Sequence, residues 1–324
     1  MQTKILITGA AGQLGTELAK ALIEKYGKYN VIASDINGNA SDQFGCSFMI
    51  LDVLDINTLS SIVNNNGITQ IYHLAAALSA VAEEKPLRAW HLNVQGLLNV
   101  LEIARIYKLD KVFWPSSIAV FGEGAPKIKT PQDALKNPTT TYGIAKVTGE
   151  SWCAYYNHTY GLDVRSVRYP GIIGHATPPG GGTTDYAVEL FFRAAKEDPY
   201  VCYLKPDTRL PMMYMPDAIK AALMIMEADK EQIKISSSYN VAAMSFTPQE
   251  LYESITKHQP NFNIAYRPDF RQAIANSWPE SINDSYARED WGWQPDYNLE
   301  KMTIDMLSNL TLQENENSKV IQTF

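Results

Sequence analysis

A tyrosine and a lysine stand four residues apart in the segment TTYGIAKVTGE, residues 140–150. On a helix, Tyr142 and Lys146 would lie on one face, because four residues make a little more than one turn. A neighbouring ammonium group stabilises the phenolate and lowers the pKa of a tyrosine from its ordinary value of about 10. Such a tyrosine could act as a general base toward a substrate hydroxyl. Ser116 and Ser117, at the end of the preceding apolar run, could orient the reacting oxygen.

A glycine-rich segment, TGAAGQLG at residues 8–15, follows the apolar run KILIT and precedes a helical pattern. Its glycines, Gly9, Gly12 and Gly15, have the spacing G-x-x-G-x-x-G. Glycines between a strand and a helix let a pyrophosphate approach the backbone, and the helix N-terminus then offers it free N–H groups. A purely structural turn would also explain three glycines, so a dinucleotide site needs further support.

That support comes from Asp35, which ends the second apolar run and follows Gly15 by twenty residues (35 − 15 = 20). A carboxylate there could accept hydrogen bonds from both ribose hydroxyls of an adenosine. No arginine follows to balance a 2′-phosphate, so NAD is favoured over NADP; a turn-forming role for Asp35 is the alternative. Further candidates for cofactor contact are Gln13, Leu14, Ile36, Asp52, Val53, Leu74, Ala75, Ala76, Tyr169 and Ile172.

The composition of the 324-residue chain is that of an ordinary globular protein, with 45% hydrophobic and 19% charged residues. The net charge of −7 provides no basic field for non-specific nucleic-acid binding. No run of about 18 apolar residues indicates a membrane span. The three cysteines and five histidines have neither disulfide nor metal-ligand spacing. An apolar run that begins at Lys4 leaves no room for a signal peptide, so we expect a cytoplasmic protein without a metal site.

Short apolar runs alternate with helical patterns up to about residue 175, and the alternation returns over 211–240. This rhythm predicts an α/β fold in which a doubly wound parallel sheet carries helices on both faces. We expect residues 1–175, with the return of 211–240, to bind the dinucleotide. Residues 176–210 and 241–312 would form a smaller mixed α/β lobe for the substrate, and 313–324 a frayed polar tail.

Together these residues resemble the short-chain dehydrogenase/reductase superfamily, in the extended branch shared with nucleotide-sugar epimerases. The resemblance implies a Rossmann-type domain, NAD as the cofactor, and Ser117, Tyr142 and Lys146 as the catalytic residues. Ser117 is preferred over Ser116 because the catalytic serine of that superfamily stands three residues before a Val-aromatic-Gly motif, here residues 120–122. The segments that carry the resemblance are TGAAGQLG, HLAA, SSIAVFG, YGIAK and DSYAREDWGWQP, with Asp35.

The same resemblance implies a supporting residue and an assembly. Asn93 is expected to belong to the cofactor-binding residues and to be a buried support for the network around the active site. Dimers of this superfamily commonly pack two helices that correspond here to residues 90–107 and 143–158. The resemblance therefore implies a homodimer.

Two departures distinguish the chain from the sugar-nucleotide enzymes of that branch. Where those enzymes carry an asparagine that touches the nucleotide sugar, this chain has Pro170. Where they carry an arginine for the diphosphate, this chain has Leu210, with Arg209 one position away. A site without these two anchors favours a smaller substrate.

Further segments are similar to the L-threonine 3-dehydrogenase family of the short-chain type. In chain order they are WPSSIAVFG, RYPG, PPGGGTTDYAVE, LPMMYMPDA, SYNVAAMSFTP and PDFRQAIANSWP. The resemblance implies that NAD oxidises the 3-hydroxyl of L-threonine to give 2-amino-3-oxobutanoate and NADH. In this reaction Tyr142 would take the hydroxyl proton, Ser117 would hydrogen-bond the reacting oxygen, and Lys146 would keep Tyr142 acidic and hold the nicotinamide ribose.

The carboxylate and ammonium groups of threonine need polar partners once water is excluded. The candidate substrate-binding residues are Ser79, Ser117, Tyr142, Gly180, Thr183, Thr184, Asp185 and Trp278. Asp185 could face the ammonium group, and Trp278 could close over the site. The glycine run at residues 180–182 could form a lid that orders when substrate binds. A flexible surface loop and a core tryptophan are the structural alternatives.

Three other functions compete with threonine oxidation. A sugar-nucleotide epimerase or dehydratase is disfavoured by Pro170 and Leu210. A dehydrogenase of another small β-hydroxy amino acid or hydroxy acid is poorly excluded by sequence. A non-catalytic NAD-sensing regulator on the same fold would have no need of an intact catalytic trio.

Overall fold

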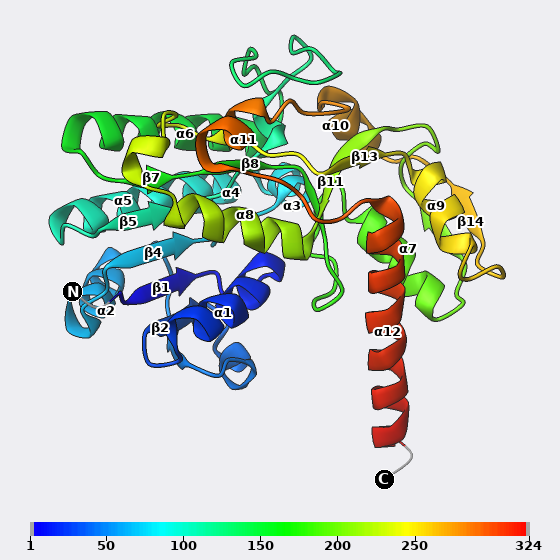
Figure 1. Cartoon of the computed structure of the whole chain (residues 1–324), viewed down its shortest axis with the longest axis horizontal. Helices are drawn as coiled ribbons and strands as arrows, with labels where there is room; N and C mark the ends of the chain where they lie inside the picture. Colours follow the sequence, from blue (N-terminus) through cyan, green and yellow to red (C-terminus); the bar gives the residue numbers. More distant parts are fainter. Residues whose placement is uncertain (1–2, 322–324) are drawn as a thin grey trace.

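The computed structural model describes residues 3–321 and contains a six-stranded parallel sheet (Figure 1). The strand order is β3-β2-β1-β4-β5-β7, so the direction of winding reverses between β1 and β4. Ligands of doubly wound folds bind at the carboxyl ends of the strands beside such a reversal. The strands are β1 (Ile5–Thr8), β2 (Val31–Asp35), β3 (Ser47–Ile50), β4 (Gln70–His73), β5 (Lys111–Phe113) and β7 (Val164–Arg165).

Helices cover both faces of this sheet (Figure 1). The helices in and around this domain are α1 (Gln13–Tyr26), α2 (Ile56–Asn66), α3 (Ser79–Glu84), α4 (Pro86–Trp90), α5 (Gly96–Ile106), α6 (Thr141–Tyr160), α8 (Met215–Glu227) and α11 (Ser285–Trp291). Shorter turns are η1 (Gly38–Gln43), the π turn η2 (His91–Gln95), η3 (Ile118–Val120) and η4 (Lys230–Gln232).

Successive residues of β1 belong to separate hydrophobic clusters on the two faces of the sheet. Ile5 and Ile7 pack in one cluster with residues of α1 and α8. Leu6 packs in the other cluster with residues of α2 and α5. Because side chains alternate along a strand, a strand covered on both faces is apolar at successive positions, as at Ile5, Leu6 and Ile7. The expected doubly wound α/β fold with a parallel sheet is confirmed.

The described residues also form two three-stranded sheets. One has the order β12-β8-β6, and in it Ser117 of β6 lies opposite Tyr169 of β8. The other has the order β13-β11-β9, with β9 and β11 parallel. Their strands are β6 (Ser116–Ser117), β8 (Val167–Tyr169), β9 (Gly171–Ile173), β11 (Leu210–Tyr214), β12 (Tyr239–Asn240) and β13 (Met244–Phe246).

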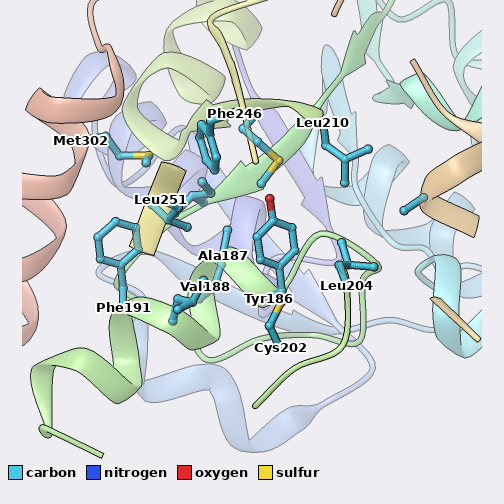
Figure 2. Close-up of a cluster of buried hydrophobic side chains, with 14 of the residues drawn as sticks. Tyr186, Ala187, Val188, Phe191, Cys202, Leu204, Leu210, Phe246, Leu251 and Met302 are labelled. Carbon is cyan, nitrogen blue, oxygen red and sulfur yellow. The ribbon is translucent and has the colours of Figure 1, made fainter. Parts of the chain in front are cut away.

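The remaining elements form a mixed group around a hydrophobic cluster that they share with β9, β11 and β13. They are α7 (Tyr186–Ala195), β10 (Tyr200–Cys202), α9 (Pro248–Thr256), β14 (Ile264–Tyr266), α10 (Arg271–Ser277) and α12 (Leu299–Ile321). In Figure 2, Tyr186 and Phe191 of α7 lie in one cluster with Phe246, Leu251 and Met302, which come from β13, α9 and α12. This packing joins segments that are more than a hundred residues apart in the chain.

The last helix, α12, continues to Ile321, whereas the sequence predicted a frayed tail from residue 313. The stretch contains Gln, Glu and Lys, which have good helix propensity, and no Gly or Pro that would end a helix. Residues 322–324 lie outside the described range. Within residues 3–321, no helix combines the length and the apolar composition that crossing a bilayer requires.

Candidate active site

A cavity of about 440 Å³ lies at the carboxyl ends of β1 and β4, next to the reversal of the strand order. Most of the residues that the sequence analysis proposed for the site line this one cavity. They are Gly9, Gly12, Gln13, Leu14, Gly15, Leu74, Ala76, Ser79, Ser117, Tyr142, Lys146, Tyr169, Ile172, Gly180, Thr184, Asp185 and Trp278. The proposed residues outside the lining are Asp35, Ile36, Asp52, Val53, Ala75, Asn93 and Thr183.

The cavity wall also contains residues that sequence reasoning missed. Leu78 and Val81 belong to the segment after β4, and Pro115 and Met215 lie beside β6 and at the start of α8. Leu78 and Val81 follow the HLAA motif within a few residues. Extending that motif along the chain would therefore have found these two.

The glycine segment brings the backbone of two elements unusually close together. Gly9 has φ +74°, and a Cβ atom there would lie 2.5 Å from the backbone N of Ala75. A Cβ atom on Gly15 would lie 2.3 Å from the carbonyl oxygen of Gly9. Larger residues at either position would force the backbone apart. The glycines therefore permit a tight turn at the N-terminus of α1 with no side chain in it.

Asp35 ends β2 beside this turn. Its Oδ2 accepts a hydrogen bond from the backbone N of Ala11 at 3.0 Å, and its Oδ1 accepts one from Asn37 at 3.0 Å. The carboxylate is thus fixed next to the glycine segment and remains partly exposed. Ile36, the next residue, is 67% exposed. This placement is compatible with the predicted contacts to a ribose and an adenine.

The other two residues predicted near the adenine make contacts within the protein. Asp52 accepts a hydrogen bond from the backbone N of Leu54 at 2.9 Å. Val53 is buried, and its side chain lies against Gly96 at the start of α5. Their contacts with an adenine stay a prediction.

Asn93 lies in the π turn between α4 and α5 and is buried. Its Oδ1 accepts from the backbone N of Ala77 at 2.7 Å, and its Nδ2 donates to the carbonyl of Ala77 at 3.0 Å. Both hydrogen-bonding groups of the side chain therefore hold the segment that follows β4, which lines the cavity. π turns often occur where a helix presents a functional side chain. The contacts are those that a buried support would make.

Tyr142 and Lys146 lie on one face of α6, as their spacing predicts. The Nζ of Lys146 lies 5.5 Å from the centre of the Tyr142 ring and 4.5 Å from that of Trp114. It also donates a hydrogen bond to the carbonyl of Pro115 at 2.6 Å. Ser117, from β6, hydrogen-bonds the Tyr142 phenol. Two segments of the chain, residues 114–117 and the first turns of α6, therefore meet around Tyr142 and Lys146.

The two serines of the WPSS segment have different partners. Ser116 donates its hydroxyl to Oε1 of the buried Glu150 at 2.7 Å. Ser117 instead accepts from the backbone N of Ala119 at 3.2 Å and contacts Tyr142. This difference supports the choice of Ser117 as the serine that faces the reacting oxygen.

The ionisation of Tyr142 and Lys146 differs from the sequence expectation. Burial raises the pKa of Tyr142 to about 12, although the hydrogen bond with Ser117 opposes the rise. Burial also lowers the pKa of Lys146 to about 7, against the attraction of Cys153 and Glu150. The sequence predicted a lowered tyrosine pKa from the nearby ammonium. In the protein without ligands, the loss of solvation outweighs that attraction.

Replacing Lys146 with methionine is expected to stabilise the protein without ligands at pH 6 by on the order of 1–3 kcal/mol. The folded-state pKa of about 7 lies below the ordinary value of 10.5, so the unfolded chain binds more protons between these values. The buried ammonium group lowers the free energy of unfolding by its full amount below pH 7. This destabilisation disappears as the pH rises toward 10.5. Urea unfolding at pH 6, 8 and 10 measures the difference.

In that experiment the gain should be largest at pH 6 and should shrink as the pH rises. The exposed Lys257 offers a control, because Lys257→Met should leave the pH profile of stability unchanged. If Lys146→Met were less stable than the parent protein at pH 6, the conclusion that the buried ammonium group destabilises the fold would be wrong.

The predicted substrate-binding residues form a small hydrogen-bonded group. The hydroxyl of Ser79 contacts the hydroxyl of Thr183 at 3.0 Å and accepts from its backbone N at 3.0 Å. Oδ2 of Asp185 accepts from the backbone N atoms of Gly181 and Gly182, at 2.9 and 2.8 Å. Gly180 and Gly182 line the cavity, and a Cβ atom on Gly181 would lie 2.8 Å from Cγ2 of Val81 in α3.

Two more observations concern the rim of the cavity. The Nε2 of Gln13 donates to the carbonyl of Pro178 at 3.0 Å, which joins the glycine segment to the loop before α7. Trp278 is 5% exposed and lines the cavity, and its indole Nε1 has no hydrogen-bond partner among the described residues. Trp278 therefore belongs both to the hydrophobic core and to the cavity wall.

A model of the NAD-dependent epimerase/dehydratase family matches residues 5–242 of the sequence. The chain belongs to that family. An uncharacterized epimerase/dehydratase from Staphylococcus haemolyticus is 47% identical over 98% of this chain and 99% of its own length.

Solved structures of L-threonine dehydrogenases are similar to this member of the family. The holo form of a GalE-like L-threonine dehydrogenase from Cupriavidus necator is 54% identical, with a TM-score of 0.92, over 95% of this chain and 99% of that one. A monomeric L-threonine 3-dehydrogenase from a metagenome is 49% identical, with a TM-score of 0.93, over 95% of this chain and 99% of that one. The resemblance that the sequence motifs indicated is confirmed.

The cofactor of this epimerase/dehydratase family member is NAD. The site fits this molecule, because the turn at Gly9 and Gly15 has no room for side chains and leaves backbone N–H groups of α1 open to a pyrophosphate. The carboxylate of Asp35 is held beside this turn by the backbone N of Ala11, and its contact with a ribose stays a prediction. Among the described residues, no group of three or more acidic, histidine or cysteine side chains is placed to hold a metal ion.

Proposed function

We propose that this protein is an L-threonine 3-dehydrogenase, which oxidises the 3-hydroxyl of L-threonine to 2-amino-3-oxobutanoate and thereby acts in threonine catabolism toward glycine. The proposal is carried by the likeness of nearly the whole chain to two L-threonine dehydrogenase structures. The meeting of Ser117, Tyr142 and Lys146 at one cavity adds chemical support.

In the proposed reaction, bound NAD supplies the acceptor for the hydride that leaves C3 of threonine. Tyr142 takes the proton of the 3-hydroxyl, and Ser117 hydrogen-bonds the same oxygen. With a pKa of about 12 before ligands bind, Tyr142 holds its proton at neutral pH, so it acts as the base only after that proton has passed to solvent. The Lys146 ammonium, 5.5 Å from the ring centre, favours the phenolate when the site is closed to water.

The substrate proposed for this site is small and carries two charges. Arg209, which could have served a diphosphate, hydrogen-bonds the Ser245 carbonyl at 2.9 Å and pairs with Glu250, outside the cavity lining. That position supports a substrate without a diphosphate. Thr184, Ser79 and the backbone around Gly180 are proposed for the carboxylate of threonine, because they line the cavity.

Asp185 has a second possible role besides the ammonium group of threonine. One of its oxygens already holds two backbone N–H groups of the glycine run. Burial raises the pKa of Asp185, although the backbone hydrogen bonds of residues 180–182 and Arg271 oppose the rise. We propose that Oδ1 receives the ammonium group while Oδ2 keeps the run closed as a lid.

The proposal is tested by NADH absorbance after purified protein and NAD are mixed with L-threonine, and in parallel with L-serine, L-allo-threonine and UDP-glucose. We expect NADH to accumulate with L-threonine and not with UDP-glucose. A folded protein that binds NAD but gives no NADH with L-threonine would overturn the proposal.

The same assay separates the competing functions. An epimerase returns the hydride to its substrate, so UDP-glucose would be converted without lasting NADH. A dehydrogenase of another hydroxy amino acid would give a larger kcat/KM with L-serine or L-allo-threonine. A regulator would bind NAD and turn over none of these compounds.

We also propose a homodimer through the face formed by α5 and α6. This face carries exposed aromatic and aliphatic side chains, among them Ile106, Ile144, Trp152 and Tyr155, which are 36% to 51% exposed. Such a concentration of apolar groups is typical of an interface. One similar dehydrogenase is monomeric. Sedimentation equilibrium of the purified protein tests the oligomeric state, and a mass of about one 36.2 kDa chain would contradict the dimer.

A further inference from the structure

The first turn of α6 is held by two side chains from different parts of the protein. Thr140, just before the helix, accepts from the backbone N of Gly143 at 3.1 Å, which is an ordinary N-cap. Oε1 of Glu83 accepts from the backbone N of Thr141 at 2.6 Å. Glu83 lies in α3, 58 residues earlier in the chain. The hydrogen bond is therefore a tertiary link between two helices.

We propose that Glu83 is a positioning residue for the reaction, because its carboxylate anchors the first turn of α6 to α3 and so sets the place of the Tyr142 hydroxyl. Thr141 directly precedes Tyr142. The proposal rests on the proposed function only for the identity of the substrate. The anchoring itself is a property of the protein without ligands.

The opposite side of this turn is already fixed by close packing. A Cβ atom on Gly143 would lie 2.3 Å from the Ala119 carbonyl oxygen and 2.6 Å from the Cβ of Pro138. Glu83 therefore restrains the turn on the side that faces α3. With both sides held, the phenol of Tyr142 has little freedom to move relative to Ser117 and the cavity.

A carboxylate is well suited to this position. The first N–H groups of a helix have no partner within it, and the helix dipole makes them attractive to negative charge. The hydrogen bond is therefore charge-assisted and short. A glutamine at residue 83 would keep an acceptor oxygen at the same reach and lose only the charge.

The anchor also joins the catalytic helix to the loop over the substrate cavity. Ser79, at the start of α3, holds Thr183 through two hydrogen bonds. The same short helix thus contacts the glycine loop at its first residue and the first turn of α6 at its fifth. Turnover falls steeply when the general base is displaced, because a shift of about 1 Å can lower the rate on the order of 10²-fold.

The test compares Glu83→Ala, Glu83→Gln and Glu84→Ala, with kcat and KM for L-threonine and hydrogen exchange of residues 140–146 in the protein without ligands. Glu84 is an exposed residue of the same helix and serves as the matched control. We expect Glu83→Ala to lower kcat by about 10- to 100-fold with little change in the KM for NAD. Hydrogen exchange near Thr141 should become faster in Glu83→Ala. In Glu83→Gln, kcat and the exchange rate near Thr141 should both lie close to those of the parent protein.

A reciprocal variant removes the donor instead of the acceptor. Thr141→Pro eliminates the N–H group at the first position of α6, where proline is well tolerated. Combined with Glu83→Ala it should lower kcat no further than either change alone, because both break the same hydrogen bond.

The outcomes separate this inference from the proposed function. If the parent protein oxidises L-threonine and Glu83→Ala keeps full kcat with unchanged exchange near Thr141, the inference is wrong. The inference is also wrong if Glu84→Ala has the same effect as Glu83→Ala. If the parent protein is inactive with L-threonine, the proposed function fails, while the exchange measurement still decides whether Glu83 anchors the helix.

Discussion

Replacing Tyr142 with phenylalanine is expected to lower kcat for L-threonine oxidation by about 10²- to 10⁴-fold, the usual contribution of a general base. The change removes only the phenolic oxygen that Ser117 hydrogen-bonds. The aromatic ring stays against Lys146, so the fold and the cofactor segment at residues 8–15 should be unaffected. NADH absorbance measures the turnover, and isothermal titration with NAD measures the binding, which should change less than threefold.

A control for this prediction is Tyr29→Phe. Tyr29 is 82% exposed and lies away from the cavity lining. Its variant should keep the full kcat. If Tyr142→Phe retained more than about a tenth of the parent kcat, the base would have to be another group, and the assignment of Tyr142 would be wrong.

Replacing Arg168 with methionine is expected to cost about 3–5 kcal/mol in the free energy of unfolding at pH 7. Arg168 and Glu150 are both buried and form two hydrogen bonds, at 2.7 and 2.9 Å. Without Arg168, Ser116 and Lys136 would be the hydrogen-bond partners left to the Glu150 carboxylate among the described residues. A buried charge with incomplete pairing is strongly destabilising, whatever the net contribution of the intact pair. Urea unfolding with an unchanged m-value measures this loss.

The pH dependence of this loss gives a second check. Burial alone would raise the pKa of Glu150, but Arg168 and its other partners lower it below the ordinary value of 4.5. The stability from ionised Glu150 is therefore present above pH 4.5 and lost as the pH falls through the folded-state pKa. The difference in unfolding free energy between Arg168→Met and the parent protein should narrow as the pH falls, first where the carboxyl of the variant becomes neutral and then where that of the parent does.

A surface ion pair provides the comparison. Arg193 and Asp198 lie 3.2 Å apart, and their side chains are 55% and 49% exposed. Arg193→Met should change the free energy of unfolding by less than about 1 kcal/mol. If Arg168→Met lowered the free energy of unfolding by no more than Arg193→Met does, the buried network would contribute no more than a surface ion pair. That result would contradict the prediction.

The local features of the site could be predicted from the sequence. The spacing of Tyr142 and Lys146 is a helical repeat, and both residues lie on one face of α6. The glycines at 9 and 15 occur where a turn has no room for a Cβ atom. These features depend on neighbouring residues, so a single stretch of sequence contains the necessary information.

The features that sequence reasoning missed depend on contacts between distant segments. Glu83 and Thr141 are 58 residues apart, and no periodicity connects them. The pairing of Ser116 with Glu150 likewise requires β6 to lie against α6. The direction of the Tyr142 pKa shift was wrong in the sequence analysis because it depends on how many groups surround the phenol. Burial of this kind is a property of the whole fold.

The central claim is that this site transfers a hydride from C3 of L-threonine to NAD. The most direct test uses L-threonine with deuterium at C3, followed by mass spectrometry of the reduced cofactor and of the amino acid. The account predicts that each NADH formed carries one deuterium and that the product is 2-amino-3-oxobutanoate or its decarboxylation product. NADH without deuterium, or threonine recovered unchanged beside folded protein that binds NAD, would contradict it.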